Sequence, residues 1–272
     1  MPYVPSGYWS GLHDRRDLSA VGQSGLPAEM NEVLYRIQRR NLAAFLGRNG
    51  ADRIAGAAFD VGSGSGYWVA EWLAAGAGSV DGCDLVPAAV ERLEAEFGSS
   101  GRFVVADVGG SAPLAESTYQ FVSCMNVLLH LTDDRLFERA LANIAGLLAA
   151  NGRLLLAEPI LNNAAFERPF NPEASSRARS LAAYRGGLER CGLRLVDLAP
   201  ATAVAANPIE SRTRLGFFAW RALWAGAGLP SKLRPANAGW MGAVLGALDP
   251  LLLKLGAAPS SKFALFERPA TQ

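Results

Sequence analysis

Only three cysteines and two histidines occur in the 272 residues of this chain. The cysteines, Cys83, Cys124 and Cys191, are far apart and lie in apolar or strand-like contexts, which favours reduced core thiols over a disulfide framework or a zinc site. A cytoplasmic location is therefore expected. The sequence also lacks a carboxylate cluster with metal-ligand spacing, so a magnesium-dependent mechanism is not indicated.

The sequence has almost no net charge and no long apolar run. Its formal charge is +1, so no broad basic field attracts nucleic acid, and basic residues such as Arg36, Arg39 and Arg40 are interpreted as the solvated face of a helix. No apolar run reaches the ~20 residues of a membrane-spanning helix, and residues 1–12 contain no signal-peptide core. We therefore expect a small-molecule substrate, no nucleic-acid partner and no stable membrane insertion.

Apolar runs and helical patterns alternate along most of the chain. The length suits one large domain or one domain with a cap, and half of the residues are apolar, enough for a sizeable core. The alternation predicts an α/β protein. Strands are expected at residues 57–61, 79–83, 102–106, 120–125, 152–157 and 193–198, and helices at residues 28–46, 67–75, 87–97 and 176–191.

The stretch after the first predicted strand organises the chain. It contains, in order, Asp60, Val61, Gly62, Ser63, Gly64, Ser65 and Gly66. The glycines allow a tight turn and a close approach of a ligand to the backbone. A dinucleotide fingerprint needs a third glycine where this chain has Tyr67, and a Walker loop needs a Lys-Ser/Thr pair that is absent. Asp60 would repel a pyrophosphate but favour an ammonium or sulfonium charge, so a cationic nucleoside fits best.

At this point the sequence resembles the class I S-adenosylmethionine-dependent methyltransferases, whose first motif is an acidic residue followed by glycines at alternate positions. The resemblance covers residues 57–157 well and implies S-adenosylmethionine as the cofactor. It also implies a Rossmann-like, seven-stranded, mostly parallel sheet with helices on both faces and an antiparallel last strand, which residues 262–266 supply. Residues 51–207 would then form the cofactor-binding core, and residues 260–272 the last strand and tail.

Polar residues follow three further predicted strands. Asp84, followed by Leu85, should face the glycine turn, because neighbouring parallel strands end at the same edge of a sheet. A carboxylate accepts two hydroxyl donors, so Asp84 suits a ribose diol, as the resemblance also implies; a solvated loop aspartate is the alternative. The family places an acidic residue at Asp107, for the adenine amino group, and a backbone N–H at Val108. Asn126 could face the methionine part of the cofactor or the substrate, or form local backbone bonds.

The segment after the fourth strand carries a further resemblance. Many small-molecule methyltransferases have an Asn or Ser, apolar residues and a His there, and His130 matches that histidine. If the acceptor is a hydroxyl, its proton must leave, so His130 is the first candidate for general base and His13 the second. A structural His130, hydrogen-bonded within its loop, is the alternative. Asp133 and Asp134 are interpreted as the cap and dipole partners of the next helix.

Two parts of the chain lie outside the resemblance. Residues 1–50 contain an irregular arm with at most one short turn of helix, followed by a covering helix; the arm's aromatics, including Tyr8 and Trp9, pack on the shell or fold over the cofactor's charged end. Residues 208–259 are an apolar helical insertion, expected as a lid over the carboxyl edge and interrupted at Asp249-Pro250. The insertion could serve as core packing, a pocket for an apolar substrate, a homodimer contact or a membrane-surface contact.

The expected function is O-methylation of a small molecule, either an apolar or a glycosylated metabolite. The Asn/Asp-Pro-Pro-aromatic motif of amino-methylating DNA enzymes is missing after the fourth strand, and so is the Pro-Cys nucleophile of cytosine-C5 enzymes. N- or C-methylation of an amine, a peptide or an isoprenoid is one alternative. A nucleoside-binding protein without catalysis, whose insertion contacts another protein, is the other.

Overall fold

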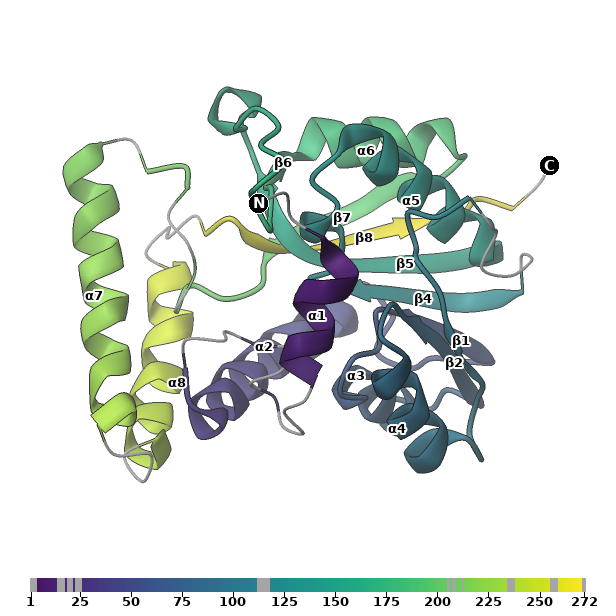
Figure 1. The fold of residues 1–272 in the computed structure, drawn as a ribbon, viewed down its shortest axis with the longest axis horizontal. Coiled ribbons are helices and arrows are strands. Elements are labelled where there is room, and N and C mark those ends of the chain that lie inside the picture. Colours follow the sequence, from purple (N-terminus) through teal and green to yellow (C-terminus); the bar gives the residue numbers. More distant parts are fainter. Residues whose placement is uncertain are drawn as a thin grey trace.

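A computed structural model shows an eight-stranded sheet flanked by helices (Figure 1). The structure describes residues 4–13, 18, 22, 26–111, 118–204, 206, 209–211, 213–233, 238–254 and 259–270, with the backbone alone at residues 12, 13, 223, 225 and 227–233. The strands are β1 Ala57–Val61, β2 Ser79–Asp84, β3 Phe103–Val105, β4 Tyr119–Met125, β5 Leu148–Leu161, β6 Arg179–Ser180, β7 Arg194–Pro200 and β8 Ser261–Glu267.

The strand order is β3-β2-β1-β4-β5-β8-β7, and the two-residue β6 pairs with the end of β5. Strands β1 to β5 pair in parallel, whereas β8 runs antiparallel to both β5 and β7. The predicted Rossmann-like, mostly parallel sheet with an antiparallel last strand is therefore confirmed. The parallel strands bring their carboxyl ends to one edge, where such folds bind ligands.

Helices cover both faces of the sheet. The α-helices are α1 Pro5–His13, α2 Ala28–Arg48, α3 Tyr67–Ala74, α4 Pro87–Phe97, α5 Asp134–Leu147, α6 Leu181–Arg190, α7 Arg214–Leu233 and α8 Ala238–Lys254, and the 3₁₀ turns are η1 Leu128–His130 and η2 Ala164–Phe166. Side chains of α5 and α6 pack on one face of the sheet, and side chains of α2, α3 and α4 pack on the other. No helix of the described residues is both long enough and apolar enough to cross a bilayer.

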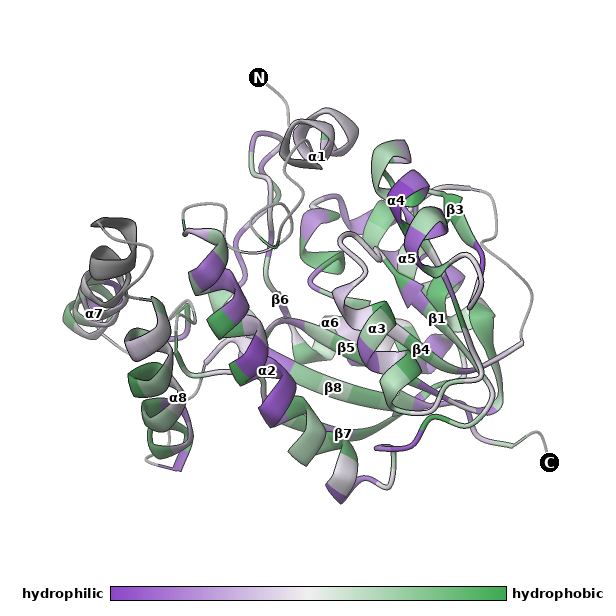
Figure 2. Cartoon of the chain, turned by 90° about the horizontal axis from the view of Figure 1, so that it is seen from below, coloured by the Kyte–Doolittle hydropathy of each residue, from purple (hydrophilic) through white to green (hydrophobic). Residues whose placement is uncertain are grey.

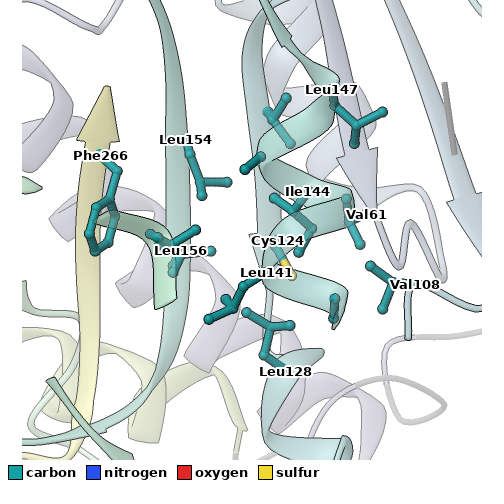
Figure 3. Close-up of a cluster of buried hydrophobic side chains, with 14 of the residues drawn as sticks. Val61, Val108, Cys124, Leu128, Leu141, Ile144, Leu147, Leu154, Leu156 and Phe266 are labelled. Atoms are coloured by element: carbon teal, nitrogen blue, oxygen red, sulfur yellow. The ribbon is translucent and has the colours of Figure 1, made fainter. Parts of the chain in front are cut away.

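Strand β4 shows why the sequences of the parallel strands are continuous apolar runs. Val122 and Cys124 belong to the cluster around Leu141 of α5, which Figure 3 shows, whereas Phe121 and Met125 belong to the cluster on the opposite face. Side chains alternate between the two faces of a strand, and here both faces are covered. The core therefore consists of two apolar layers that hold the central strands in place.

Strand β5 is longer than expected. The prediction ends it at Ala157, but it continues through Pro159 to Leu161. Pro159 pairs with Ser261 of β8, and Leu161 pairs with Ser180 of β6. These partners lie far away in the sequence, so the local turn signal of a proline was misleading.

Two helices also differ from their predicted bounds. Helix α6 begins at Leu181 rather than at residue 176, because the preceding residues form β6 and the Ser180 hydroxyl accepts a hydrogen bond from the Ala183 N–H at 3.4 Å. The N-terminal arm contains the nine-residue helix α1 instead of a single turn. Both segments also contact distant parts of the chain: β6 pairs with the end of β5, and Trp9 of α1 packs against the His130 ring.

Helix α8 runs through Asp249-Pro250, where an interruption was predicted. Pro250 has no N–H to donate to the Gly246 carbonyl one turn earlier. Arg40 of α2 donates its Nη1–H to that carbonyl at 2.7 Å instead. The Asp249 carboxylate is fully buried and accepts the Ala203 N–H at 2.8 Å. These contacts supply the lost bond and attach α8 to the core.

Candidate active site

A cavity of about 240 Å³ lies at the carboxyl edge of the parallel strands. Nine of the predicted site residues line it: Gly62, Ser63, Gly64, Asp84, Leu85, Asp107, Val108, Asn126 and His130. They come from the ends of β1, β2 and β4 and from the segment after β3. Parallel topology brings these distant segments together, as the sequence predicted.

The glycine turn needs glycine for steric reasons. Gly62 and Gly64 have φ angles of 72° and 53°, in the left-handed region that side chains disfavour. A Cβ on Gly62 would also collide with the Val127 side chain. Gly66, predicted as a cofactor contact, does not line the cavity; it has a φ of 78° at the start of α3, and a Cβ there would collide with Phe97. Gly66 therefore shapes the turn from outside the cavity.

Asp84 connects the glycine turn to β2. Its Oδ2 accepts the Gly64 N–H at 2.9 Å, and its Oδ1 accepts the Val86 N–H at 2.9 Å. The side chain is 8% exposed and lines the cavity. A carboxylate offers about four lone-pair sites, so about two remain for a ligand. The geometry therefore leaves room for the predicted bonds to a ribose diol.

Asp107 follows β3 and Asn126 follows β4, two strands whose carboxyl ends lie at the same edge of the sheet. Asp107 is exposed, and its Oδ1 accepts the Gly109 N–H at 2.8 Å. Its other oxygen has no hydrogen-bond partner within the described part of the chain. Asn126 is a non-glycine residue with a φ of 60°, and its N–H donates to Ala157 at 2.7 Å. A left-handed asparagine at a strand end is uncommon and marks a constrained position.

Asp60 does not line the cavity, in contrast to the prediction of a direct electrostatic contact. The side chain is 2% exposed and accepts a hydrogen bond from the Ser123 hydroxyl of β4. Burial raises the pKa of Asp60 to about 7. The carboxyl group therefore links β1 to β4 beneath the turn.

His130 faces the cavity from η1. Its Nδ1 lies 2.7 Å from the Ser175 carbonyl oxygen. A carbonyl can only accept, so Nδ1 carries the proton and the neutral ring keeps Nε2 as an acceptor. Burial lowers the pKa of His130, which favours this neutral form. The ring of Trp9 packs edge-on against the imidazole with 4.8 Å between centroids.

Glu158 holds the backbone of the His130 loop. Its fully buried carboxyl accepts the N–H groups of Val127 and Leu128 at 2.8 Å each and that of Leu129 at 3.1 Å. Burial raises the pKa of Glu158 to about 8. The sequence analysis did not identify this support, although Glu158 carries the same signal as Asp84, an acidic residue toward the end of a parallel strand.

Arg179 supports the same loop from the other side. The residue is 1% exposed, and its Nη2 donates to the carbonyls of Leu131 at 2.8 Å and Thr132 at 3.1 Å. Its guanidinium lies 4.0 Å from the centroid of the Phe137 ring. The predicted capping role of Asp133 is confirmed, since its Oδ1 accepts the N–H groups of the first turn of α5. No local sequence signal identifies Arg179.

Aromatic side chains form the rest of the lining. Trp9, Tyr35, Tyr67 and Trp68 all line the cavity, and the Tyr35 and Tyr67 rings lie 4.8 Å apart. Trp9 comes from α1, so the N-terminal arm contributes a side chain to the lining of the cavity. The side chain of His13 lies outside the described residues. Sequence periodicity marked Tyr35, Tyr67 and Trp68 only as helix residues.

The described residues of the insertion do not form the lid that was predicted. No described residue of α7 or α8 lines the cavity. Met241 and Leu245 of α8 instead pack against Val33 and Ile37 of α2. The inner side of the insertion therefore extends the core, whereas α1 contributes Pro5 and Trp9 to the lining of the cavity.

Comparison with known proteins gives one family match. Residues 58–152 match the model of a methyltransferase domain. No curated protein matches the chain.

Three solved structures illustrate the likeness in fold. One is a Galdieria sulphuraria protein described as a sarcosine dimethylglycine methyltransferase, with 16% identity, a TM-score of 0.54 and 86% of each chain covered. Another is the Burkholderia thailandensis 1,6-didemethyltoxoflavin-N1-methyltransferase with bound 1,6-didemethyltoxoflavin and S-adenosylhomocysteine, with 18% identity, a TM-score of 0.53 and coverage of 97% of this chain and 86% of that one. The third, the cyclase SpnF, has 20% identity, a TM-score of 0.53 and coverage of 85% and 82%.

The likeness to solved structures establishes the fold. The family match is the comparison that indicates an activity, methyl transfer. The matched segment begins within β1 and ends within β5, so it includes the glycine turn, Asp84 and Asp107. The glycine turn and the two acidic strand ends meet at one cavity, in the arrangement that the sequence resemblance implied. Residues 58–152 therefore match a methyltransferase domain, and this match, together with the shared fold, supports an S-adenosylmethionine-dependent methyltransferase with S-adenosylmethionine as its cofactor.

Proposed function

We propose that the protein transfers the methyl group to a hydroxyl of an apolar small molecule, with His130 as the general base. The observation that carries this proposal is the 2.7 Å contact between His130 Nδ1 and the Ser175 carbonyl. It fixes the tautomer in which Nε2 accepts a proton. A hydroxyl acceptor has a proton to lose, so this arrangement suits it.

The cofactor's place follows from the same cavity. In the proposal, the glycine turn Gly62–Ser65 lies against the cofactor, Asp84 accepts from its ribose diol beside Leu85, and Asp107 and Val108 meet the adenine. The free lone pairs of Asp84 and the unpaired oxygen of Asp107 support these assignments. When bound, S-adenosylmethionine supplies an activated methyl group on a sulfonium centre.

The charge of the lining supports a neutral acceptor. Among the described residues that line the cavity, the acidic ones are Asp84 and Asp107, and none is a lysine or an arginine. A carboxylate acceptor would therefore meet no cationic side chain of the described lining to offset its desolvation. A hydroxyl needs no such partner.

The aromatic residues supply positioning. Trp9, Tyr35, Tyr67 and Trp68 offer apolar surface on which an acceptor can pack while water is excluded. Methyl transfer needs the nucleophile, the carbon and the sulfur in line, and holding reactants in such an arrangement can supply about 7–11 kcal/mol. The base adds roughly 10²–10⁴ in rate to this positioning.

Replacement of His130 by glutamine tests the base. Turnover should fall roughly 10²–10⁴-fold, while the affinity for S-adenosylmethionine, measured by calorimetry, and the melting temperature stay unchanged. The pH profile gives a second readout. Protonation removes the Nε2 acceptor, so wild-type activity should fall on the acid side, below the lowered pKa of His130, and this limb should be absent in the variant.

An acceptor panel tests the reaction type. Matched alcohols, phenols, amines and carboxylic acids are incubated with the protein and the cofactor, and formation of S-adenosylhomocysteine is measured. Products from hydroxyl compounds support the proposal. Methylation of amines or acids alone would refute it. A His130→Gln variant with a lower melting temperature but unchanged turnover would also refute it.

A further inference from the structure

Helix α8 exposes an apolar stripe that the described chain does not cover. Its members, with their exposed fractions, are Trp240 at 55%, Val244 at 47%, Leu248 at 39% and Leu251 at 51%. Spacings of four, four and three residues place them on one side of a helix. This stripe differs from the buried side, where Met241 and Leu245 pack toward α2. Of the six tryptophans, Trp240 is the one classed as exposed.

Helix α7 also has an exposed apolar side. Leu215 is 81% exposed and Phe218 is 64% exposed, whereas Trp220 and Trp224 are half-buried. Figures 1 and 2 show α7 and α8 together at the flank of the molecule, beside the sheet. The insertion thus presents large apolar side chains from both helices to solvent.

The charge of the insertion is mainly positive. Residues 208–259 contain six basic residues and two acidic residues. The acidic residues are both paired: Glu210 lies 3.5 Å from Lys262, and the fully buried Asp249 lies 3.5 Å from Arg40. Arg214, Arg221 and Lys254 are exposed. The exposed charge of the two helices is therefore positive next to the apolar stripe.

We propose that α7 and α8 form a docking surface for an anionic lipid bilayer. Exposed Trp, Phe and Leu side chains can enter the boundary between headgroups and acyl chains, while arginine and lysine meet the lipid phosphates. A second copy of the chain would bring like charges together, which disfavours self-association through this surface. This inference does not depend on the acceptor of the methyl group.

The geometry is compatible with an accessible active site. No described residue of α7 or α8 lines the cavity, so contact with a bilayer leaves the cavity walls in place. The described helices do not span a membrane, so the insertion would lie in the plane of the interface.

Vesicle flotation of the full-length protein tests the proposal. The probes are vesicles of phosphatidylcholine alone and of phosphatidylcholine with phosphatidylserine. The protein should float with the anionic vesicles, remain in solution with the neutral ones, and be released by added salt, because salt screens the attraction. Absence of binding to the anionic vesicles, or equal binding to both, would overturn the proposal.

Variants locate the surface. Arg214→Gln combined with Arg221→Gln should weaken partition about 25-fold, because each arginine near an anionic surface contributes about fivefold. Trp240→Ser combined with Leu251→Ser should also weaken it. The matched control is Val196→Ser, which changes an apolar side chain on β7 that is 39% exposed, and which should bind like wild type.

Two further measurements complete the test. All variants should retain wild-type affinity for S-adenosylmethionine, which shows that they are folded. Light scattering should give the mass of a monomer; a dimer that the Trp240 and Leu251 substitutions dissociate would assign the stripe to self-association and overturn the lipid proposal.

Discussion

Two walls of the cavity differ in how a carboxylate supports them. In the wall that β1 and β2 form, one carboxylate both holds a loop and lines the cavity. In the wall that contains His130, one residue holds the loop and another lines the cavity. Asp84 accepts two backbone N–H groups and lines the cavity. On the other wall, Glu158 accepts three backbone N–H groups from a fully buried position, and His130 lines the cavity. In both walls a carboxylate fixes the backbone that the ligand would meet.

The difference predicts which functions can be separated by mutation. A change at Asp84 alters the turn and the proposed ribose contact together. A change at Glu158 alters the support of the loop without removing a group that lines the cavity. Three substitutions can therefore break or sharpen the comparison, in order of decreasing effect.

The largest effect is expected for Glu158→Ala. Three backbone N–H groups lose their acceptor, and each such loss costs at least about 1 kcal/mol when the donor stays buried, so the free energy of unfolding should fall by about 3 kcal/mol or more. Urea denaturation measures this change. The matched control is Glu158→Gln, which keeps one side-chain oxygen. In the native residue Oε1 alone accepts two of the three hydrogen bonds, so the free energy of unfolding of this variant should fall by only about 1–2 kcal/mol. Equal losses in both variants would show that the hydrogen bonds do not support the loop.

A smaller effect is expected for Asp84→Asn. Asparagine retains one acceptor oxygen, so one backbone bond and one site for the ribose diol are lost. The dissociation constant for S-adenosylmethionine should rise roughly 10–100-fold, the equivalent of about 1.4–2.8 kcal/mol. Calorimetry measures this change.

The control for Asp84 lies on the same strand. Asp81 accepts the Arg102 N–H at 2.8 Å and the Tyr119 hydroxyl at 2.7 Å, and it does not line the cavity. Asp81→Asn should therefore leave cofactor affinity unchanged. If both variants lose affinity equally, the effect comes from β2 as a whole and the proposed contact of Asp84 is refuted.

The smallest loss of stability at neutral pH is expected for Asp60→Asn, because asparagine keeps an oxygen that can accept the Ser123 hydroxyl. The pKa of Asp60 is raised from 3.8 to about 7, so between these values the folded state holds a proton that the unfolded state has lost. Stability should therefore fall as pH rises from about 4 to about 7 and level off above that. Asparagine does not ionise, so the variant should show a flatter profile in urea denaturation at a series of pH values.

Glu158 serves as a reference for this profile. Its raised pKa, about 8, gives a fall of the same sign that extends to higher pH and that persists in Asp60→Asn. A variant profile identical to that of wild type would show that Asp60 is ionised throughout this range.

Local patterns were sufficient to place most residues of the proposed cofactor site at one cavity. The glycine turn needs left-handed φ angles, and a buried parallel strand needs a continuous apolar run, so both leave a mark in the sequence. Asp84, Asp107 and Asn126 could be placed at one edge because parallel strands end together. The same reasoning did not place Asp60 correctly. No local signal distinguishes a carboxylate that faces a ligand from one that accepts a hydrogen bond from Ser123 on the neighbouring strand.

The sequence by itself indicated the glycine turn, the mostly parallel sheet and His130 as a residue of the candidate site, because each depends on backbone geometry or on the chemistry of one residue type. Tertiary structure decided the rest. Arg40 allows α8 to continue through Pro250, Arg179 fixes the loop after η1, and Trp9 of α1 reaches the cavity in place of the insertion. These contacts join residues far apart in the chain, and their free energy depends on distance in space, which the spacing of residues along the sequence does not record.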